Sequence, residues 1–180
     1  MKLLLHTCCA PCVIYPLERL KAGGYSVRGY FYNPNIHPFS EYNNRLKAVM
    51  DFSHKHNLEM VHPEYHPEEF FQAVNLKEER PERCAICWSL RLQKTALAAK
   101  EMGCGHFSTT LLVSPYQDQE ALKKIGEEIG QEVSVEFFYE DFRPGFKKAH
   151  EQAKSEGIYC QKYCGCLYSE IERCKKSEKH

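Results

Sequence analysis

Three short groups of cysteines carry the residues of this sequence that are best suited to chemistry. The thiols in these groups are Cys8, Cys9, Cys12, Cys84, Cys87, Cys164 and Cys166. A structural zinc ion takes four ligands, and a four-iron cluster also takes four. If the fold brings the thiols of all three groups together, there are more of them than the four ligands that either centre requires. The pattern therefore predicts a cluster beside a second metal or redox group.

Taken alone, each group is open to more than one interpretation. Cys84 and Cys87 project from one face of an expected helix, which also suits a redox dithiol or half of a zinc site. The glycine between Cys164 and Cys166 permits a tight bend that directs both thiols at one metal. We favour metal binding because all three groups occur in one chain.

The sequence does not predict export or a membrane span. The apolar stretch 1–6 is too short for a signal peptide, and no run approaches the roughly 20 apolar residues of a spanning helix. We therefore expect a cytoplasmic protein with reduced thiols, with disulfides as the alternative. Its 180 residues fit a single domain, 1–180, and a hydrophobic content of 43% allows a core without disulfide staples.

Short apolar runs alternate with helical patterns along the chain. Strands are expected at 2–7, 25–32, 58–62, 106–113 and 133–139, and helices at 11–22, 40–56, 68–74, 83–102, 115–129 and 146–156. The last segment is expected to be irregular or briefly helical. This alternation predicts an α/β fold with a doubly wound, mainly parallel sheet flanked by helices.

The first cysteine group falls where such folds bind their ligands. Cys8, Cys9 and Cys12 lie in the turn after the first expected strand, and ligands bind beyond the carboxyl ends of strands at a topological switch point. The free N–H groups at the start of the following helix favour anions and lower thiol pKa values. Neither common glycine-rich phosphate-binding pattern occurs at this turn.

Polar residues follow two further strands. Asp141 and Arg143 come after the fifth expected strand, where they form either part of the site or a surface salt bridge. Tyr116 and Gln117 come after the fourth, where they either contact a nucleobase and donate a proton or serve capping and packing.

Other residues have simpler interpretations. Glu41 and Arg45 are four residues apart on an expected helix, which predicts an exposed ion pair. His6, beside the first cysteine group, suits a hydrogen-bonded core histidine about as well as a functional role. The cysteines that stand singly are predicted to be small buried hydrophobes, and they are Cys104, Cys160 and Cys174.

Five motifs, spread over nearly the whole chain, combine these residues. They are 6–12 (HTCCAPC), 82–87 (ERCAIC), 108–117 (STTLLVSPYQ), 141–143 (DFR) and 161–169 (QKYCGCLYS). Together they closely resemble the QueH-type epoxyqueuosine reductases. The resemblance implies a fold like the adenine-nucleotide α-hydrolases and a [4Fe-4S] cluster with an adjacent mononuclear iron. It also implies the last step of queuosine synthesis in tRNA, in which the epoxide oxygen of epoxyqueuosine is removed.

Reduction of an epoxide to an alkene requires two electrons and two protons, and the oxygen leaves as water. A cluster of this type passes one electron at a time, so a second redox centre or an external electron donor must complete the reaction. An open metal beside the cluster would weaken the C–O bond as a Lewis acid.

We expect the cluster ligands to be Cys9, Cys84, Cys87 and Cys164. The remaining thiols, with Asp141, would hold the single iron, although sequence leaves this division open. The expected catalytic residues are Asp141, Tyr116 and Arg143.

The expected partners are tRNA carrying epoxyqueuosine and an external electron donor, without a membrane. Residues 143–180 hold nine Lys or Arg and five Glu, a net charge of 9 − 5 = +4, which suits contact with tRNA phosphates. One alternative is a non-catalytic, metal-stabilised tRNA-binding module. Another is a tRNA sulfur-transfer enzyme of related fold, which the missing phosphate loop disfavours.

Overall fold

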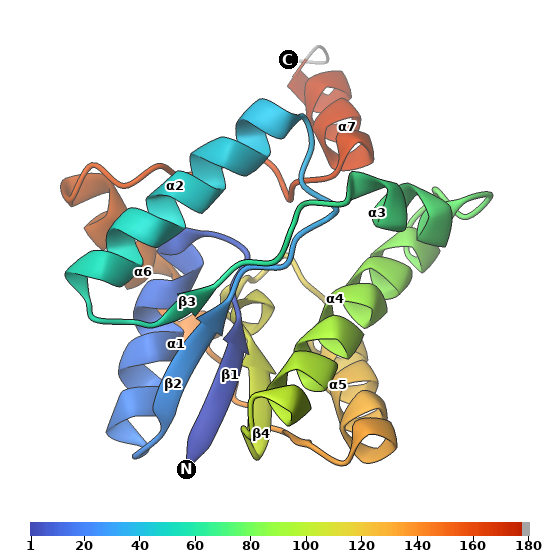
Figure 1. Cartoon of the computed structure of the whole chain (residues 1–180). Helices are drawn as coiled ribbons and strands as arrows, with labels where there is room; N and C mark the ends of the chain where they lie inside the picture. The colour runs from blue at the N-terminus through green and yellow to red at the C-terminus, as the bar shows by residue number, and fades with distance from the viewer. Residues whose placement is uncertain (178–180) are drawn as a thin grey trace.

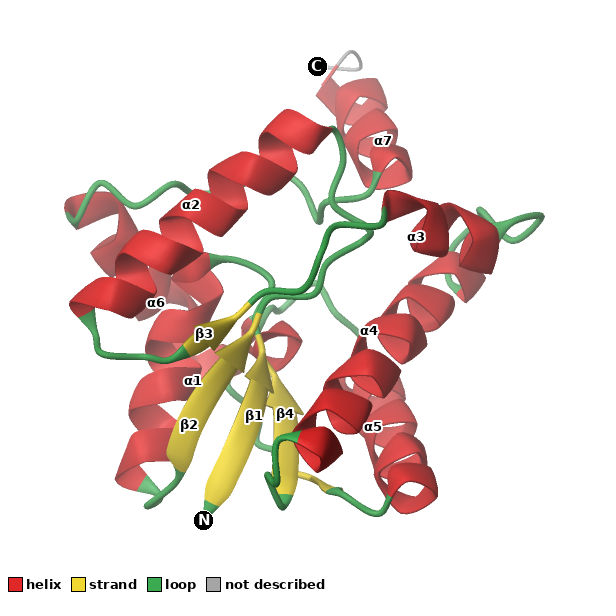
Figure 2. Ribbon diagram, viewed as in Figure 1, coloured by secondary structure: helices red, strands yellow, loops and turns green. Residues whose placement is uncertain are grey.

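The computed structural model describes residues 1–177, which form one five-stranded sheet covered by helices. The strands are β1 (Lys2–His6), β2 (Ser26–Tyr30), β3 (Met60–Val61), β4 (His106–Thr109) and β5 (Glu136–Phe137). Their order across the sheet is β3-β2-β1-β4-β5, and every pairing is parallel (Figure 2). The predicted doubly wound parallel sheet is therefore confirmed.

Helices cover both faces of this sheet. They are α1 (Ala10–Ala22), α2 (Phe39–Lys55), α3 (Pro67–Val74), α4 (Glu82–Glu101), α5 (Gln119–Val133), α6 (Phe146–Ser155) and α7 (Leu167–Ser177), with the 3-10 turns η1 (Thr110–Val113) and η2 (Arg143–Gly145). Helices α1, α2 and α6 pack on one face, and α4 and α5 pack on the other (Figure 1). Helices α3 and α7 lie beyond the carboxyl edge of the sheet.

The central strand explains the sequence pattern at the N-terminus. Leu3, Leu4 and Leu5 are fully buried, because helices cover both faces of β1. A strand that is buried on both sides has a continuous run of apolar residues in its sequence, rather than apolar residues that alternate with polar ones. From β1 the chain winds outward through β2 and β3, and it then crosses to β4 and β5 on the other side. The carboxyl end of β1 is therefore the switch point of the fold.

Several element boundaries differ from the sequence prediction. The strand expected at 106–113 ends at Thr109, because the Thr109 hydroxyl accepts the N–H of Leu111 at 3.1 Å and begins the 3-10 turn η1. The helix expected from 115 begins at Gln119, because Asp118 caps it through the N–H of Ala121 at 3.0 Å. The last segment, predicted as irregular or briefly helical, contains the helix α7.

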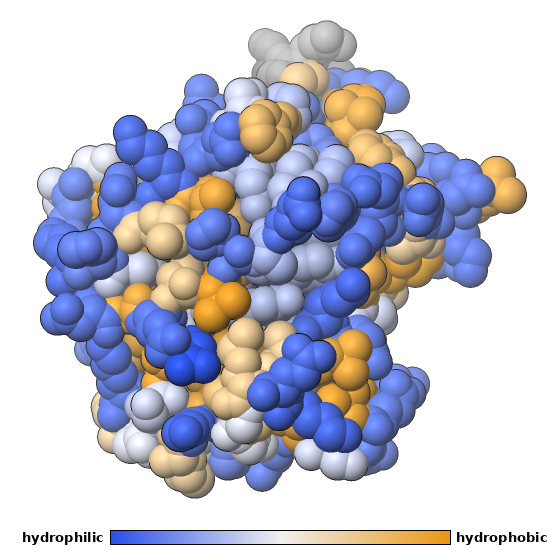
Figure 3. Space-filling model, viewed as in Figure 1, coloured by the Kyte–Doolittle hydropathy of each residue, from blue (hydrophilic) through white to orange (hydrophobic). Residues whose placement is uncertain are grey.

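On the face shown in Figure 3, hydrophilic residues cover most of the molecule and hydrophobic residues form smaller patches. Within residues 1–177, none of the helices has both the length and the apolar character that a membrane crossing requires.

Candidate metal centre

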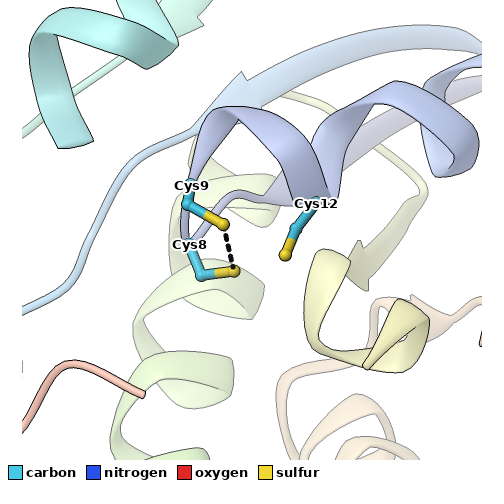
Figure 4. A group of neighbouring side chains, drawn as sticks. All are labelled: Cys8, Cys9 and Cys12. Atoms are coloured by element: carbon cyan, nitrogen blue, oxygen red, sulfur yellow. Dashed lines mark hydrogen bonds between the residues drawn. The ribbon is translucent and has the colours of Figure 1, made fainter. Parts of the chain in front are cut away.

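The turn between β1 and α1 holds a compact group of buried thiols, which we call the three-thiol group: Cys8, Cys9 and Cys12. Their Sγ atoms all lie within 4.8 Å of one another, and those of Cys8 and Cys9 are 3.6 Å apart (Figure 4). Cys9 is extended immediately before α1, and Cys12 lies in the first turn of that helix. An ion bonded at about 2.3 Å to each sulfur keeps its ligands within about 4.6 Å of one another. The spacing is close to that of a single-ion site.

Thr110, the first residue of η1, supports the three-thiol group from the turn that follows β4. Its hydroxyl accepts the N–H of Cys8 at 3.1 Å and donates to Cys8 Sγ at 3.3 Å. Hydrogen bonds from the Cys12 and Cys9 thiols, with a smaller contribution from Thr110, lower the pKa of Cys8 well below its usual value. Burial raises the pKa of Cys9. The group therefore stabilises a thiolate at Cys8, the form that binds metal.

A second set of thiols lines a cavity of about 180 Å³ between α4 and the segment before α7. This four-thiol group consists of Cys84, Cys87, Cys164 and Cys166. The first two extend from the beginning of α4. The other two flank Gly165, whose φ of +139° is strained for any residue with a side chain, so glycine is required for this bend.

Electrostatics also connects the four thiols. Burial raises the pKa of Cys84, and it raises the pKa of Cys87 to about 12. Charge on Cys164 or Cys166 raises both values further. Cys84 and Cys87 therefore resist deprotonation, and a positively charged ligand such as a metal centre would favour their thiolate forms.

Both groups open on one larger cavity of about 400 Å³. Cys8 and Cys12 line it from the three-thiol group, and Cys164 lines it from the four-thiol group. Its wall also includes Tyr116, Gln117, His150 and Lys162. We call this space the shared cavity. A molecule bound in it can face both sets of thiols at once.

The expected surface ion pair between Glu41 and Arg45 is wrong, because both residues are buried. Arg45 is 2% exposed, and its Nε donates to Glu41 Oε1 at 2.7 Å. Its Nη1 and Nη2 donate to the carbonyl oxygens of Cys164 and Tyr163, each at 3.0 Å. The spacing of four residues correctly indicated a pair on one helical face. It could not show that a distant segment would fold over that face.

Two further side chains at the site were missed by sequence reasoning. Gln161 Nε2 donates to Cys9 Sγ at 3.0 Å and lies 3.9 Å from Cys12 Sγ. His150, from α6, lines the shared cavity, and burial lowers its pKa. Gln161 belongs to the motif at 161–169 and could have been selected on that ground. His150 has no comparable local signal, because only the packing of α6 against α1 brings it to the cavity.

Tyr116 and Gln117, which follow the fourth expected strand, line both cavities. The Tyr116 side chain is 81% exposed at the rim of both cavities. Gln117 Oε1 accepts the indole N–H of Trp88 at 3.0 Å, and its Nε2 lies 3.8 Å from Cys164 Sγ. Gln117 therefore has a packing partner on one side and a thiol on the other.

Asp141 and Arg143 are placed differently. They form an ion pair with each other, with Arg143 Nη2 2.6 Å from Asp141 Oδ2, and neither lines the two cavities. His6 is a hydrogen-bonded core residue, since Nδ1 is 2.9 Å from Thr109 Oγ1 and Nε2 is 3.2 Å from the Tyr32 carbonyl. Burial lowers the pKa of His6 to about 3, so it is neutral at ordinary pH.

No disulfide joins any of the ten cysteines in the described part of the chain, and the three single ones differ in environment. Cys104 is buried after the end of α4, as predicted. Cys160 is only partly buried and donates to the Ile158 carbonyl at 3.4 Å. The prediction for Cys174 is wrong, because this residue is exposed on α7.

We expect Cys104→Ala and Cys174→Ala to keep the metal content and most of the activity of the unmodified protein. With a rise of about 1.5 Å per residue, the length of α4 alone puts Cys104 roughly 20 Å or more from Cys87. The measurement is the iron content and visible absorption spectrum of each folded variant, prepared without oxygen. A lost spectrum in either variant would mean that the metal ligands are grouped incorrectly.

Comparisons with known proteins identify relatives over most of the chain. The family model described as "Epoxyqueuosine reductase QueH" matches residues 3–172. A protein of that name from Dehalococcoides mccartyi is 39% identical over 173 residues, which are 96% of this chain and 94% of the relative. Its namesake from Thermotoga maritima is 37% identical over 181 residues, covering 96% of this chain and 92% of the relative. The one from Acinetobacter baylyi is 35% identical, covering 93% and 80%.

One solved structure supports the fold. It is the crystal structure of a predicted subunit of tRNA methyltransferase from Methanocaldococcus jannaschii, with a TM-score of 0.54. The match covers 85% of this chain and 76% of the other at 10% identity, so the similarity concerns the fold alone.

Proposed function

The chain belongs to the QueH family of epoxyqueuosine reductases, and we propose that it is an oxidoreductase that converts epoxyqueuosine in tRNA to queuosine. The observation that carries this proposal is the shared cavity, onto which both thiol groups open. A reductase needs its electron source and its substrate in contact. A module that only bound tRNA would have no need for two sets of thiols around one cavity.

The four-thiol group fits a [4Fe-4S] cluster. Such clusters take four cysteine thiolates, and the cavity offers four. The same cavity contains the buried Arg91, whose Nη2 has no hydrogen-bond partner among the described residues. A cluster with four thiolates is anionic and would supply both an acceptor and a counter-charge for this guanidinium.

The three-thiol group fits a mononuclear iron. Its sulfur atoms are at single-ion spacing, and soft thiolates bind iron well. We therefore assign the cluster to Cys84, Cys87, Cys164 and Cys166, and the single iron to Cys8, Cys9 and Cys12. This assignment differs from the sequence-based one in two ways. Cys166 replaces Cys9 among the cluster ligands, and Asp141, which lines neither cavity, is not a ligand of the single iron.

When bound, these two centres would supply one-electron transfer and a Lewis acid for the epoxide oxygen. The protein's own residues would hold the substrate. In this proposal the modified base enters the shared cavity, Gln117 contacts it by hydrogen bonding, and Tyr116 at the rim is the candidate proton donor. The catalytic role expected of Asp141 and Arg143 stays a prediction.

The decisive test of function is conversion of the substrate. The protein is prepared without oxygen, supplied with a chemical reductant as electron donor, and incubated with tRNA that carries epoxyqueuosine. We expect mass spectrometry of the digested tRNA to show a nucleoside that has lost one oxygen atom. The Cys104→Ala variant should give the same product. No conversion by protein with full iron and sulfide would overturn the proposed activity.

We also propose that tRNA and an external electron donor meet this protein in the cytoplasm, where thiols remain reduced. Of the C-terminal basic residues expected to bind tRNA, Lys179 and the side chain of Lys176 lie outside the described part of the structure. Lys162 lines the shared cavity, and Lys175 is exposed on α7. Lys162 is therefore the candidate for a phosphate contact at the cavity, and Lys175 is a candidate for one on the exposed surface of α7.

Replacing both Lys162 and Lys175 by Gln should flatten the dependence of log affinity on log salt. Each lost phosphate contact reduces the slope by about 0.7–0.9. Binding of modified and unmodified tRNA should weaken alike, because phosphate contacts carry no base information. The measurement is a salt titration of binding, with Lys124→Gln on α5 as the control. An unchanged slope would place the tRNA contact elsewhere.

A further inference from the structure

Helix α4 carries a buried arginine whose charge no neighbouring carboxylate balances among the described residues. Arg83, Cys87 and Arg91 are spaced by four residues, so they lie along one face of the helix. Arg91 is 1% exposed and lines the four-thiol cavity. Its Nε donates to the Cys87 carbonyl at 3.3 Å, whereas its Nη2 is buried with no partner among residues 1–175.

The other buried arginines at the site are neutralised. Arg45 pairs with Glu41 at 2.7 Å, and Arg83 pairs with Glu172 at 2.5 Å. Within the part of the chain that the structure describes, no carboxylate lies within ion-pair distance of Arg91. Burial of an unpaired charge is strongly unfavourable, so a guanidinium in this position requires an anionic neighbour.

The groups that can supply this negative charge are the thiols around Arg91. Cys84, Cys87, Cys164 and Cys166 line the same cavity as Arg91, whose buried Nη2 has no partner among the described residues. A metal centre held by these residues as thiolates would supply the missing negative charge.

We infer that Arg91 is a positioning residue that sets the reduction potential of the centre at the four-thiol group. This inference rests on the proposed function. The guanidinium balances the negative charge of the iron-bound thiolates and donates its free Nη2–H to a sulfur atom. Such hydrogen bonds and charges tune the potential of an iron–sulfur centre. Each electron from the external donor adds one negative charge, and a fixed positive charge beside the centre favours that step.

The test is a redox titration of the anaerobically reconstituted protein, followed by electron paramagnetic resonance. Arg91→Gln should lower the midpoint potential, because the added electron loses its positive neighbour. We expect the ratio of reduced to oxidised centre at a fixed potential to fall by at least tenfold, which is about 59 mV for one electron. Arg91→Lys keeps the positive charge, so its midpoint potential should lie close to that of the unmodified protein. Lys94→Gln removes the same charge from an exposed position on the same helix, and it should produce little shift.

The outcomes separate this inference from the proposed function. If unmodified protein holds the cluster and Arg91→Gln shifts the potential no more than Lys94→Gln, the inference is wrong and the reductase assignment stands. If the Arg91→Gln variant binds no cluster, the Arg91→Lys variant distinguishes the two explanations. A cluster bound by Arg91→Lys with a near-normal midpoint potential supports the role of the positive charge. Failure of Arg91→Lys to bind a cluster rejects that role. Unmodified protein without a cluster would overturn both the cofactor assignment and this inference.

Discussion

Serine in place of Cys87 should remove most of the cluster iron and abolish reduction of epoxyqueuosine. Cys87 is buried in the four-thiol cavity, and a neutral hydroxyl there cannot replace a thiolate ligand. Loss of one of four ligands also leaves Arg91 with less negative charge beside it. The measurement is iron and acid-labile sulfide per chain after anaerobic reconstitution, together with the conversion assay.

Two matched substitutions, Cys104→Ser and Cys9→Ser, distinguish loss of the cluster from general damage to the fold and from loss of the single iron. Cys104→Ser makes the same change in a buried thiol that lines neither cavity, so iron, sulfide and activity should be retained. Cys9→Ser should lose the single iron but keep the sulfide, because Cys9 belongs to the three-thiol group. Full iron and normal turnover in Cys87→Ser would remove this residue from the metal site.

Replacing Arg45 by Met should destabilise the protein by about 3–5 kcal/mol, the usual cost of breaking a buried ion pair from one side. The substitution leaves the Glu41 carboxylate buried without its cation. It also removes the N–H donors from the carbonyls of Tyr163 and Cys164. We expect lower iron content as well, because the segment that carries Cys164 loses its anchor. The measurements are the free energy of unfolding from urea titration and the iron content.

The double variant Glu41→Met/Arg45→Met is the informative control. It removes both charges, so it should be less destabilised than Arg45→Met alone. Lys124→Met breaks an exposed pair of the same spacing on α5, between Lys124 and Glu128, and should leave the free energy of unfolding nearly unchanged. If Arg45→Met behaves like Lys124→Met, Arg45 does not anchor the segment.

Periodicity was sufficient to predict the fold because the sheet is buried on both sides. The apolar run of β1 and the glycine stop of α1 at Gly23 identified the first unit, and with it the position of the three-thiol group. The adjacency of the thiols within each group was also visible in the sequence. Motif resemblance then identified the family.

The division of the thiols depends on tertiary structure and was not predictable from spacing. Arg45 of α2 helps to hold the segment of Cys164 and Cys166 near α4, although Arg45 and Cys164 are 119 positions apart in the sequence. The burial of Arg45 depends on the same segment, whereas the position of His150 depends on the packing of α6 against α1. The spacing of Arg83, Cys87 and Arg91 did carry a signal, since positions four apart share a helical face. Only the structure shows that this face is enclosed.

Anomalous diffraction at the iron absorption edge would locate the two iron centres that we propose around the shared cavity. Crystals of the anaerobically prepared protein should show two separate features. We expect an extended feature enclosed by Cys84, Cys87, Cys164 and Cys166, and a single-ion peak bounded by Cys8, Cys9 and Cys12. A single feature, or a cluster bonded to Cys9 in place of Cys166, would contradict this assignment.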